Sequence, residues 1–166
     1  MKADKIYVVG FMAAGKTTLA RALANRLDWR AVDIDELIEQ RERCSVSEIF
    51  ARHGEPYFRA VERAVLLDQL PPRHLVVATG GGTFVDPSNR AAINGDGVSI
   101  WLDVPLDRAI ARLPSDGRRP LAADRTEFER LYHQRRAAYQ QAHLRVEAGR
   151  ASADALVEEV IDWLDA

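Results

Sequence analysis

Residues 10–17, with the sequence GFMAAGKT, combine two glycines, a lysine and a threonine at the spacing of a phosphate-binding loop. Gly10 and Gly15 can adopt backbone conformations closed to other residues, so that successive N–H groups turn inward around phosphate oxygens. Lys16 would bring a positive charge to the terminal phosphates, and the Thr17 hydroxyl would ligate the Mg²⁺ that accompanies ATP. The pattern therefore predicts a site for the polyphosphate of a nucleotide.

Two carboxylates follow in the segment VDIDE, residues 32–36. If this segment is extended, a separation of two places Asp33 and Asp35 on the same side of the chain. Asp33 is then the candidate holder of hydrated Mg²⁺, and Asp35 is the candidate base that accepts the proton of an incoming hydroxyl. The alternative is that Asp35 only caps the helix that follows, which would leave Asp33 unexplained.

Two further features indicate a site for an anionic, hydroxyl-bearing small molecule. Arg59 lies between the apolar residues Phe58 and Val61, so its guanidinium can reach inward as a fork for a carboxylate. The segment VVATGGGTF carries three consecutive glycines, at 80–82, and missing side chains allow a ligand to approach the backbone closely. Taken alone, the arginine could be an ordinary surface residue.

Residues 108–136 hold eight arginines against four acidic residues, in a chain that is acidic overall. Within them the segment LPSDGRRPLAA has the composition of a loop between two helices, and it carries Arg118 and Arg119. Such a loop could close over the nucleotide and neutralise charge during phosphate transfer, or it could be only a solvated charged loop. Arg135 and Arg136 follow on the next helix, where at least one could face the same site.

The elements that would position these residues alternate between strand-like and helical patterns, which favours an α/β fold with a mainly parallel sheet. Strands are predicted at about 5–9, 30–33, 74–79, 97–102 and 143–147. Ser45 and Glu48 form a capping box for a helix at about 46–53 that Gly54 ends. Pro71 and Pro72 close the next helix, and the last helix, at about 153–164, has one apolar face.

The composition fits one compact domain without an electrostatic reason to bind nucleic acid or a membrane. The chain has 166 residues, a net charge of −2 and no stretch near the roughly 20 apolar residues that a membrane span requires. The N-terminus has an apolar run like that of an export signal, but Asp4, Gly10 and Lys16 interrupt the pattern. Cys44 has no partner for an internal disulfide, and the four histidines lack metal-ligand spacing. A cytoplasmic monomer that acts on a small-molecule substrate is expected.

The ordered motifs GxxxxGKT, DID, GEPYFRAVE, TGGG, RRPL and RRAAY resemble those of the shikimate kinase family over essentially the whole chain. The resemblance implies a three-layer α/β/α P-loop kinase fold with a five-stranded parallel sheet in the order 2-3-1-4-5. It implies a single kinase domain over residues 1–166, with a substrate-binding region at about 34–61 and a lid at about 113–124. It also implies transfer of the γ-phosphate of ATP, with Mg²⁺, to the 3-hydroxyl of shikimate, on the route to chorismate and the aromatic amino acids.

The same resemblance implies roles for individual residues. The catalytic residues would be Lys16, Asp35 and Arg119, and the metal would be held by Thr17 and Asp33. The nucleotide would contact Ala13, Ala14, Gly15, Lys16, Thr17, Thr18, Arg112, Arg119 and, as a further candidate, Arg150. Shikimate would contact Asp35, Arg59, Gly80, Gly81, Gly82 and Arg135.

Two segments depart from the family pattern. RRAAY, residues 135–139, stands where the family often has R-x-P-L-Y, so Arg135 and Arg136 both remain candidates for the substrate contact. VEAGRASA, residues 146–153, lacks the aspartate and proline that usually lie near the adenine. The alternatives are a related kinase acting on gluconate, another polyol acid or a nucleoside monophosphate, or a nucleotide-binding homologue without catalysis.

Overall fold

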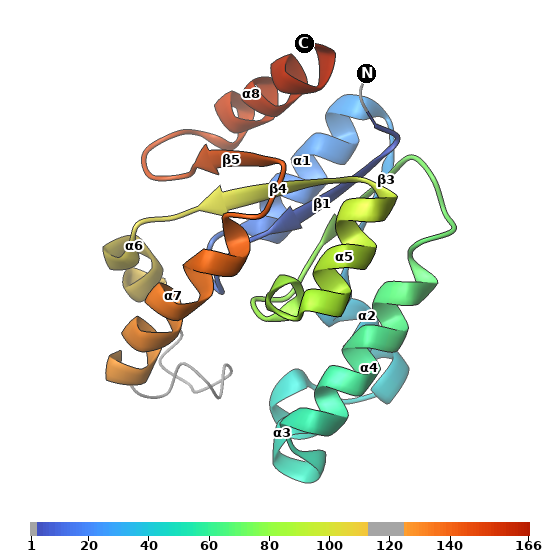
Figure 1. The fold of residues 1–166 in the computed structure, drawn as a ribbon, viewed down its shortest axis with the longest axis vertical. Coiled ribbons are helices and arrows are strands. Elements are labelled where there is room, and N and C mark those ends of the chain that lie inside the picture. Colours follow the sequence, from blue (N-terminus) through green and yellow to red (C-terminus); the bar gives the residue numbers. More distant parts are fainter. Residues whose placement is uncertain (1–2, 113–124) are drawn as a thin grey trace.

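Five strands form one parallel sheet in the order β2-β3-β1-β4-β5 (Figure 1). The computed structural model describes residues 3–112 and 125–166. Its strands are β1 (Lys5–Val9), β2 (Arg30–Asp33), β3 (Leu75–Ala78), β4 (Val98–Asp103) and β5 (Leu144–Glu147). Every strand predicted from the sequence is present within one residue of its predicted ends, and the predicted strand order is confirmed.

Helices cover both faces of this sheet, and they follow the strands in alternation (Figure 1). The helices are α1 (Lys16–Leu27), α2 (Ile34–Glu42), α3 (Val46–His53), α4 (Glu55–Asp68), the short 3₁₀ helix η1 (Thr83–Val85), α5 (Pro87–Asp96), α6 (Leu106–Ala111), α7 (Arg125–Tyr139) and α8 (Ala153–Asp165). Helices α1 and α8 pack together on one face, whereas α5 and α7 lie on the other. Helices α2, α3 and α4 pack against one another beside β2 and β3. None of the helices in residues 3–112 and 125–166 is long and apolar enough to cross a bilayer.

Strand β1 lies at the centre of the sheet and is buried along its whole length. It pairs with β3 on one side and β4 on the other, so that Tyr7 lies opposite both Val77 and Ser99. Because helices cover both faces, a strand in this position must be apolar almost throughout, which explains the run KIYVV. The buried amine of Lys5 donates hydrogen bonds to the carbonyl oxygens of Leu70, at 3.0 Å, and Pro72, and it forms an ion pair with Asp96 at 3.2 Å.

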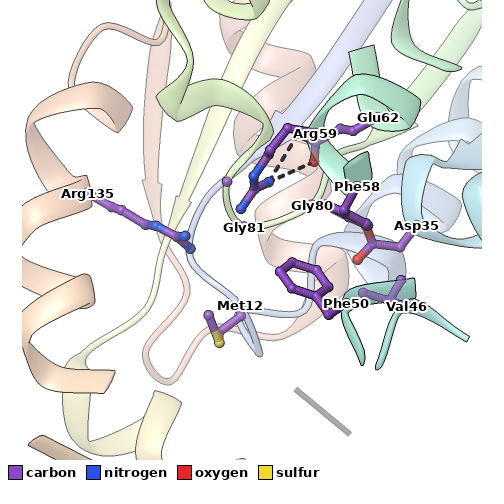
Figure 2. Close-up of a pocket in the computed structure, with 11 residues that line it drawn as sticks. Met12, Asp35, Val46, Phe50, Phe58, Arg59, Glu62, Gly80, Gly81 and Arg135 are labelled. Atoms are coloured by element: carbon purple, nitrogen blue, oxygen red, sulfur yellow. Dashed lines mark hydrogen bonds and ion pairs between the residues drawn. The ribbon is translucent and has the colours of Figure 1, made fainter. Parts of the chain in front are cut away.

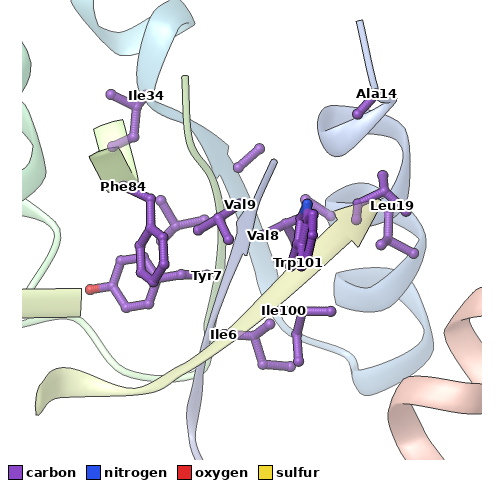
Figure 3. Close-up of a cluster of buried hydrophobic side chains, with 14 of the residues drawn as sticks. Ile6, Tyr7, Val8, Val9, Ala14, Leu19, Ile34, Phe84, Ile100 and Trp101 are labelled. Atoms are coloured by element: carbon purple, nitrogen blue, oxygen red, sulfur yellow. The ribbon is translucent and has the colours of Figure 1, made fainter. Parts of the chain in front are cut away.

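The core consists of two apolar layers, one on each side of this sheet (Figure 3). Side chains alternate along β1, so Tyr7 points toward Phe84 while Val8 points toward Leu19. All four are at most 2% exposed. The core therefore holds β1 and the start of α1 in fixed positions, and the loop between them carries the glycine-rich motif.

Helix boundaries follow local signals that the sequence already shows. The Ser45 hydroxyl accepts a hydrogen bond of 3.1 Å from the N–H of Glu48 at the start of α3, and Gly54, with a φ of 82°, ends that helix. Both predictions are confirmed. The predicted apolar face of α8 is also confirmed, because it buries Leu156, Val157, Val160, Ile161 and Leu164.

Gly97 offers a test of how closely β4 approaches β1. A Cβ at this position would lie 2.6 Å from the carbonyl oxygen of Lys5, so Gly97→Ala forces the backbone of the central strands to shift. We expect this change to lower the free energy of unfolding by about 1–3 kcal/mol, as measured by urea denaturation. The matched control is Gly95→Ala in α5, where an added Cβ meets nothing within 4 Å. The control should be stabilising by up to about 1 kcal/mol, and equal effects of the two changes would contradict the account.

Candidate active site

The loop between β1 and α1 forms a cradle at the carboxyl edge of the sheet. Gly10, Ala13 and Gly15 have φ values of 146°, 65° and 93°, which bend the chain sharply around the start of the helix. A side chain at Gly10 has no room, since its Cβ would lie 2.6 Å from the carbonyl oxygen of Leu102. The loop borders a polar pocket, here called the phosphate pocket, whose lining residues are Ala13, Ala14, Gly15, Lys16, Thr17, Thr18, Asp33, Asp35, Thr79, Gly80 and Gly81.

Lys16 is the cation of the phosphate pocket, and it is only 8% exposed. Its amine donates hydrogen bonds to the carbonyl oxygens of Gly10 and Phe11, at 2.8 and 2.9 Å. These bonds hold the amine beside the loop. It lies at the N-terminus of α1, where main-chain N–H groups carry partial positive charge. An anion in this pocket would therefore meet both a full charge and a helix N-terminus.

Asp33 ends β2 and lies beside Thr17, whose hydroxyl donates a hydrogen bond to its carboxylate. The other oxygen of Asp33 accepts a hydrogen bond of 3.1 Å from the N–H of Glu36, so Asp33 is the N-cap of α2. The alternative that Asp35 is the cap is therefore wrong. The expected extended geometry is also wrong, because the helix begins at Ile34, which places Asp35 in its first turn. Both carboxylates nevertheless line the phosphate pocket.

A second pocket, here called the acceptor pocket, opens beside the first (Figure 2). Arg59 from α4 and Arg135 from α7 reach into it from opposite sides and point toward each other across Gly81. Arg135 is only 8% exposed. The remaining lining residues are Met12, Asp35, Val46, Phe50, Phe58, Glu62, Gly80 and Gly82. The pocket thus combines apolar walls with two guanidinium groups and two carboxylates, and this combination suits a small polar molecule with an anionic group.

Each of the three consecutive glycines lies against a different charged side chain. A Cβ at Gly80 would lie 2.9 Å from an Asp35 oxygen, and one at Gly82 would lie 2.6 Å from two Arg59 nitrogens. A Cβ at Gly81 would lie 3.3 Å from a nitrogen of Arg135. Lack of room for a side chain thus explains the run of glycines. A side chain at any of the three positions would displace Asp35, Arg59 or Arg135 from the acceptor pocket.

Glu62 is a site residue that the sequence reasoning missed. Its side chain is 1% exposed, and both oxygens accept hydrogen bonds from Arg59, at 3.1 and 3.2 Å. The Thr83 hydroxyl donates a further bond of 2.9 Å and itself accepts one from the N–H of Gly80. Burial raises the pKa of Glu62 above its ordinary range, although Arg59 and Thr83 oppose the shift. The available signal was an acidic residue three positions after Arg59, which is one turn along the same helix.

A third pocket borders the cradle on its other side, between α1, β4 and the chain around β5. Its lining residues are Ala13, Ala14, Gly15, Thr18, Leu19, Leu102, Arg112, Ala148, Ala151, Ala153 and Leu156. Arg112 donates hydrogen bonds to the carbonyl oxygens of Ala13 and Ala14, at 3.2 and 3.1 Å, so it contacts the cradle directly. Arg150 is exposed and is not among the lining residues. Arg118, Arg119 and the expected lid at 113–124 lie outside the described residues.

The structure distinguishes the two consecutive arginines, of which the family resemblance favoured Arg135 and left Arg136 as an alternative. Arg135 lines the acceptor pocket, whereas Arg136 donates hydrogen bonds to Asp103 at the end of β4. Most of the predicted site residues within the described ranges therefore lie around two adjoining pockets. They are the residues of the phosphate cradle, Asp33, Asp35, Arg59, the three glycines and Arg135.

A main-chain cradle for phosphates that adjoins a pocket for a charged acceptor is the arrangement of a P-loop kinase. The family model described as "Shikimate kinase" matches residues 12–165. Shikimate kinase of Persephonella marina is 39% identical over 157 residues, with 94% of this chain and 96% of the relative covered. Shikimate kinase of Synechococcus elongatus is 44% identical over 144 residues, covering 85% and 75%. The chain belongs to the shikimate kinase family.

A solved structure agrees with this assignment. Shikimate kinase from Acinetobacter baumannii in complex with shikimate superposes with a TM-score of 0.93 at 32% sequence identity. The superposition covers 97% of this chain and 92% of that one. The fold and the order of the site-bearing elements are therefore those of the family.

The raised pKa of Glu62 predicts a pH-dependent contribution to stability. The folded state favours the protonated carboxyl, so stability from Glu62 is fully present below its ordinary pKa of 4.5 and is lost as the pH rises through the native pKa. The free energy of unfolding of the wild type minus that of Glu62→Gln should therefore fall as the pH rises above about 4.5. Urea denaturation at several pH values measures this difference. Glu159→Gln, at an exposed site on α8, is the control, and a flat difference for Glu62→Gln would refute the assignment.

Proposed function

We propose that this protein transfers the γ-phosphate of ATP to the 3-hydroxyl of shikimate, giving shikimate 3-phosphate and ADP. The observation that carries the proposal is the junction of the two pockets, which share Asp35, Gly80 and Gly81. A hydroxyl of a molecule held in the acceptor pocket would lie next to phosphates held in the cradle. The membership of the shikimate kinase family supports shikimate as that molecule.

Recognition of the acceptor rests on its carboxylate. Arg59 and Arg135 offer two planar guanidinium forks from opposite sides of the pocket, and such forks form strong charge-assisted hydrogen bonds with carboxylates. Glu62 holds Arg59 in place and balances its charge, whereas Arg135 has no carboxylate partner among the described residues. The glycine run would let the acceptor ring lie directly on the backbone.

The transfer step needs a proton acceptor and stabilisation of charge. Asp35 would accept the proton of the 3-hydroxyl while the hydroxyl oxygen forms a bond to the γ-phosphorus. The bond from that phosphorus to the bridging oxygen breaks, and its electron pair leaves with ADP. Lys16 and the N-terminus of α1 would stabilise the negative charge on the phosphate oxygens as this happens. We also propose that Arg119, from a lid at about 113–124, adds to this stabilisation.

The donor set beside the cradle fits Mg²⁺. Thr17 and Asp33 present a hydroxyl and a carboxylate to the phosphate pocket, and Mg²⁺ prefers oxygen ligands, of which one or two come from carboxylates and others from phosphates and water. No cluster of three His, Cys, Asp or Glu side chains that could hold a metal occurs in residues 3–112 and 125–166. Thr17 and Asp33 would therefore hold Mg²⁺ together with the nucleotide, and the ion would neutralise phosphate charge when bound.

We assign the adenine to the pocket bordered by Arg112 and Ala148. Arg150 is kept as a further candidate contact, and the acceptor-binding region is assigned to about 34–61. We propose that the protein is active as a monomer. We place this activity in the cytoplasm, where ATP is available.

The identity of the acceptor is tested by a panel assay that follows ADP release with ATP and Mg²⁺. Shikimate should be turned over at least a hundredfold faster, as kcat/KM, than gluconate or a nucleoside monophosphate, because differently shaped acceptors cannot engage both arginines and Asp35 together. Faster turnover of another acceptor would reassign the substrate. ATP binding without turnover of any acid would indicate a homologue without catalysis.

Asp35→Asn tests the proposed base. The change should lower kcat for shikimate by about 10² to 10⁴, which corresponds to roughly 3–5 kcal/mol of barrier, since the amide cannot take up the proton. The KM for ATP should change less than about twofold, because the phosphate cradle is intact. Glu36→Gln is the matched control, one residue along and exposed, where Glu36 pairs with Arg21. Near-normal turnover of Asp35→Asn would remove Asp35 from the mechanism.

A further inference from the structure

Two consecutive residues of α7 point in different directions, as successive positions on a helix must. Arg135 reaches into the acceptor pocket, and Arg136 turns toward the end of β4. The direction of Arg135 therefore depends on the rotation of α7 about its own axis. A rotation of a few tens of degrees would move its guanidinium away from Gly81.

Arg136 is held by three groups outside the acceptor pocket. Two of its nitrogens donate to the two oxygens of Asp103, at 2.8 and 3.2 Å, in a bidentate pair. Its guanidinium also lies over the ring of Trp101, 4.9 Å from the centroid, and donates to the Tyr132 hydroxyl at 3.0 Å. A bidentate pair fixes direction as well as distance, so this contact restrains the rotation of α7.

The anchor for Arg136 belongs to the sheet. Asp103 is the last residue of β4, its side chain is 8% exposed, and the strand pairs with both β1 and β5. Arg145 on β5 donates to the same carboxylate at 2.8 Å and pairs with Glu147. Asp103 is therefore fixed by its strand and retains a cationic partner when Arg136 is changed.

The same helix is fixed a second time, one turn after Arg135. The hydroxyl of Tyr139 donates a hydrogen bond of 2.5 Å to the carbonyl oxygen of Gly81, and its ring packs against Trp101 with centroids 5.9 Å apart. Residues four apart lie on one face of a helix, so Tyr139 and Arg135 face the glycine run together. The two contacts, one to β4 and one to Gly81, hold α7 from two directions.

We infer that Arg136, through its bidentate pair with Asp103, is a positioning residue for the acceptor, which sets the rotation of α7 so that Arg135 meets the acceptor carboxylate. The inference rests on the proposed function, because it takes the carboxylate of shikimate as the group that Arg135 binds. Arg136 does not touch the substrate. Its effect must therefore be transmitted through Arg135 and must depend on the carboxylate.

The test compares Arg136→Gln with the wild type on two acceptors: shikimate, and the analogue in which a hydroxymethyl group replaces the carboxylate. With shikimate, kcat/KM should fall by about 10- to 100-fold, mainly through KM, while the KM for ATP stays within about twofold. With the hydroxymethyl analogue the fall should be less than about threefold, because that acceptor offers Arg135 no carboxylate. An equal fall for both acceptors, which a merely structural role would produce, overturns the inference.

Two further variants separate positioning from general loss of stability. Arg145→Gln removes the other cation on Asp103 from β5 rather than α7, so it should leave the KM for shikimate close to that of the wild type. The double change Arg135→Gln with Arg136→Gln should be no worse than Arg135→Gln alone, because residues that act through one another are not additive. An Arg145→Gln effect equal to that of Arg136→Gln, or full additivity in the double variant, also overturns the inference.

The remaining outcomes are distinguishable. If Arg136→Gln does not fold, Arg136→Lys is assayed by the same criteria, because lysine keeps the charge but cannot form the bidentate pair. A wild type that leaves shikimate unmodified overturns the proposed function and this inference with it. A wild type that is active, with a carboxylate-independent effect at Arg136, overturns the inference alone.

Discussion

Parallel pairing of the strands is the constraint on which the rest of the structure depends. Because every strand runs in the same direction, the carboxyl ends of β1, β2, β3 and β4 meet at one edge of the sheet. The phosphate loop follows β1, Asp33 ends β2, the glycine run follows β3 and Asp103 ends β4. Residues far apart in the sequence are thereby brought to one site, which is built from the ends of four strands.

At that edge, the arrangement of the site depends on charged side chains that lie close to the backbone of the glycine run. Asp35, Arg135 and Arg59 each lie against one of the three glycines, so an added methyl group would crowd a charged side chain that lines the acceptor pocket. Desolvation of these charges is offset by pairing, as in the contact of buried Glu62 with Arg59 and Thr83. Arg135 differs, since no carboxylate pairs with it in the described part of the chain, and an anionic acceptor would supply that partner.

The sequence predicts those parts of the site that depend on contacts between residues close together in the chain. The phosphate loop, the strands and the cap at Ser45 were predictable because spacing within a few residues determines them. The predicted extended course of residues 33–35 was wrong, because the pattern DID does not reveal whether the chain stays extended or turns into a helix at residue 34. Glu62 was missed although it lies one turn after Arg59. The residue pattern alone could not choose between Arg135 and Arg136, although the family resemblance named Arg135, because the choice depends on which helix face meets the glycine run and which meets Asp103.

The central claim is that one edge of the sheet holds the phosphates, while two arginines and Asp35 present the acceptor to them. A crystal structure of the protein with ADP and shikimate tests it most directly. The account predicts the acceptor carboxylate between Arg59 and Arg135, the 3-hydroxyl within hydrogen-bond distance of Asp35, and the β-phosphate on the N–H groups that precede α1. A carboxylate bound away from both arginines, or a 3-hydroxyl that faces away from the cradle, would contradict the account.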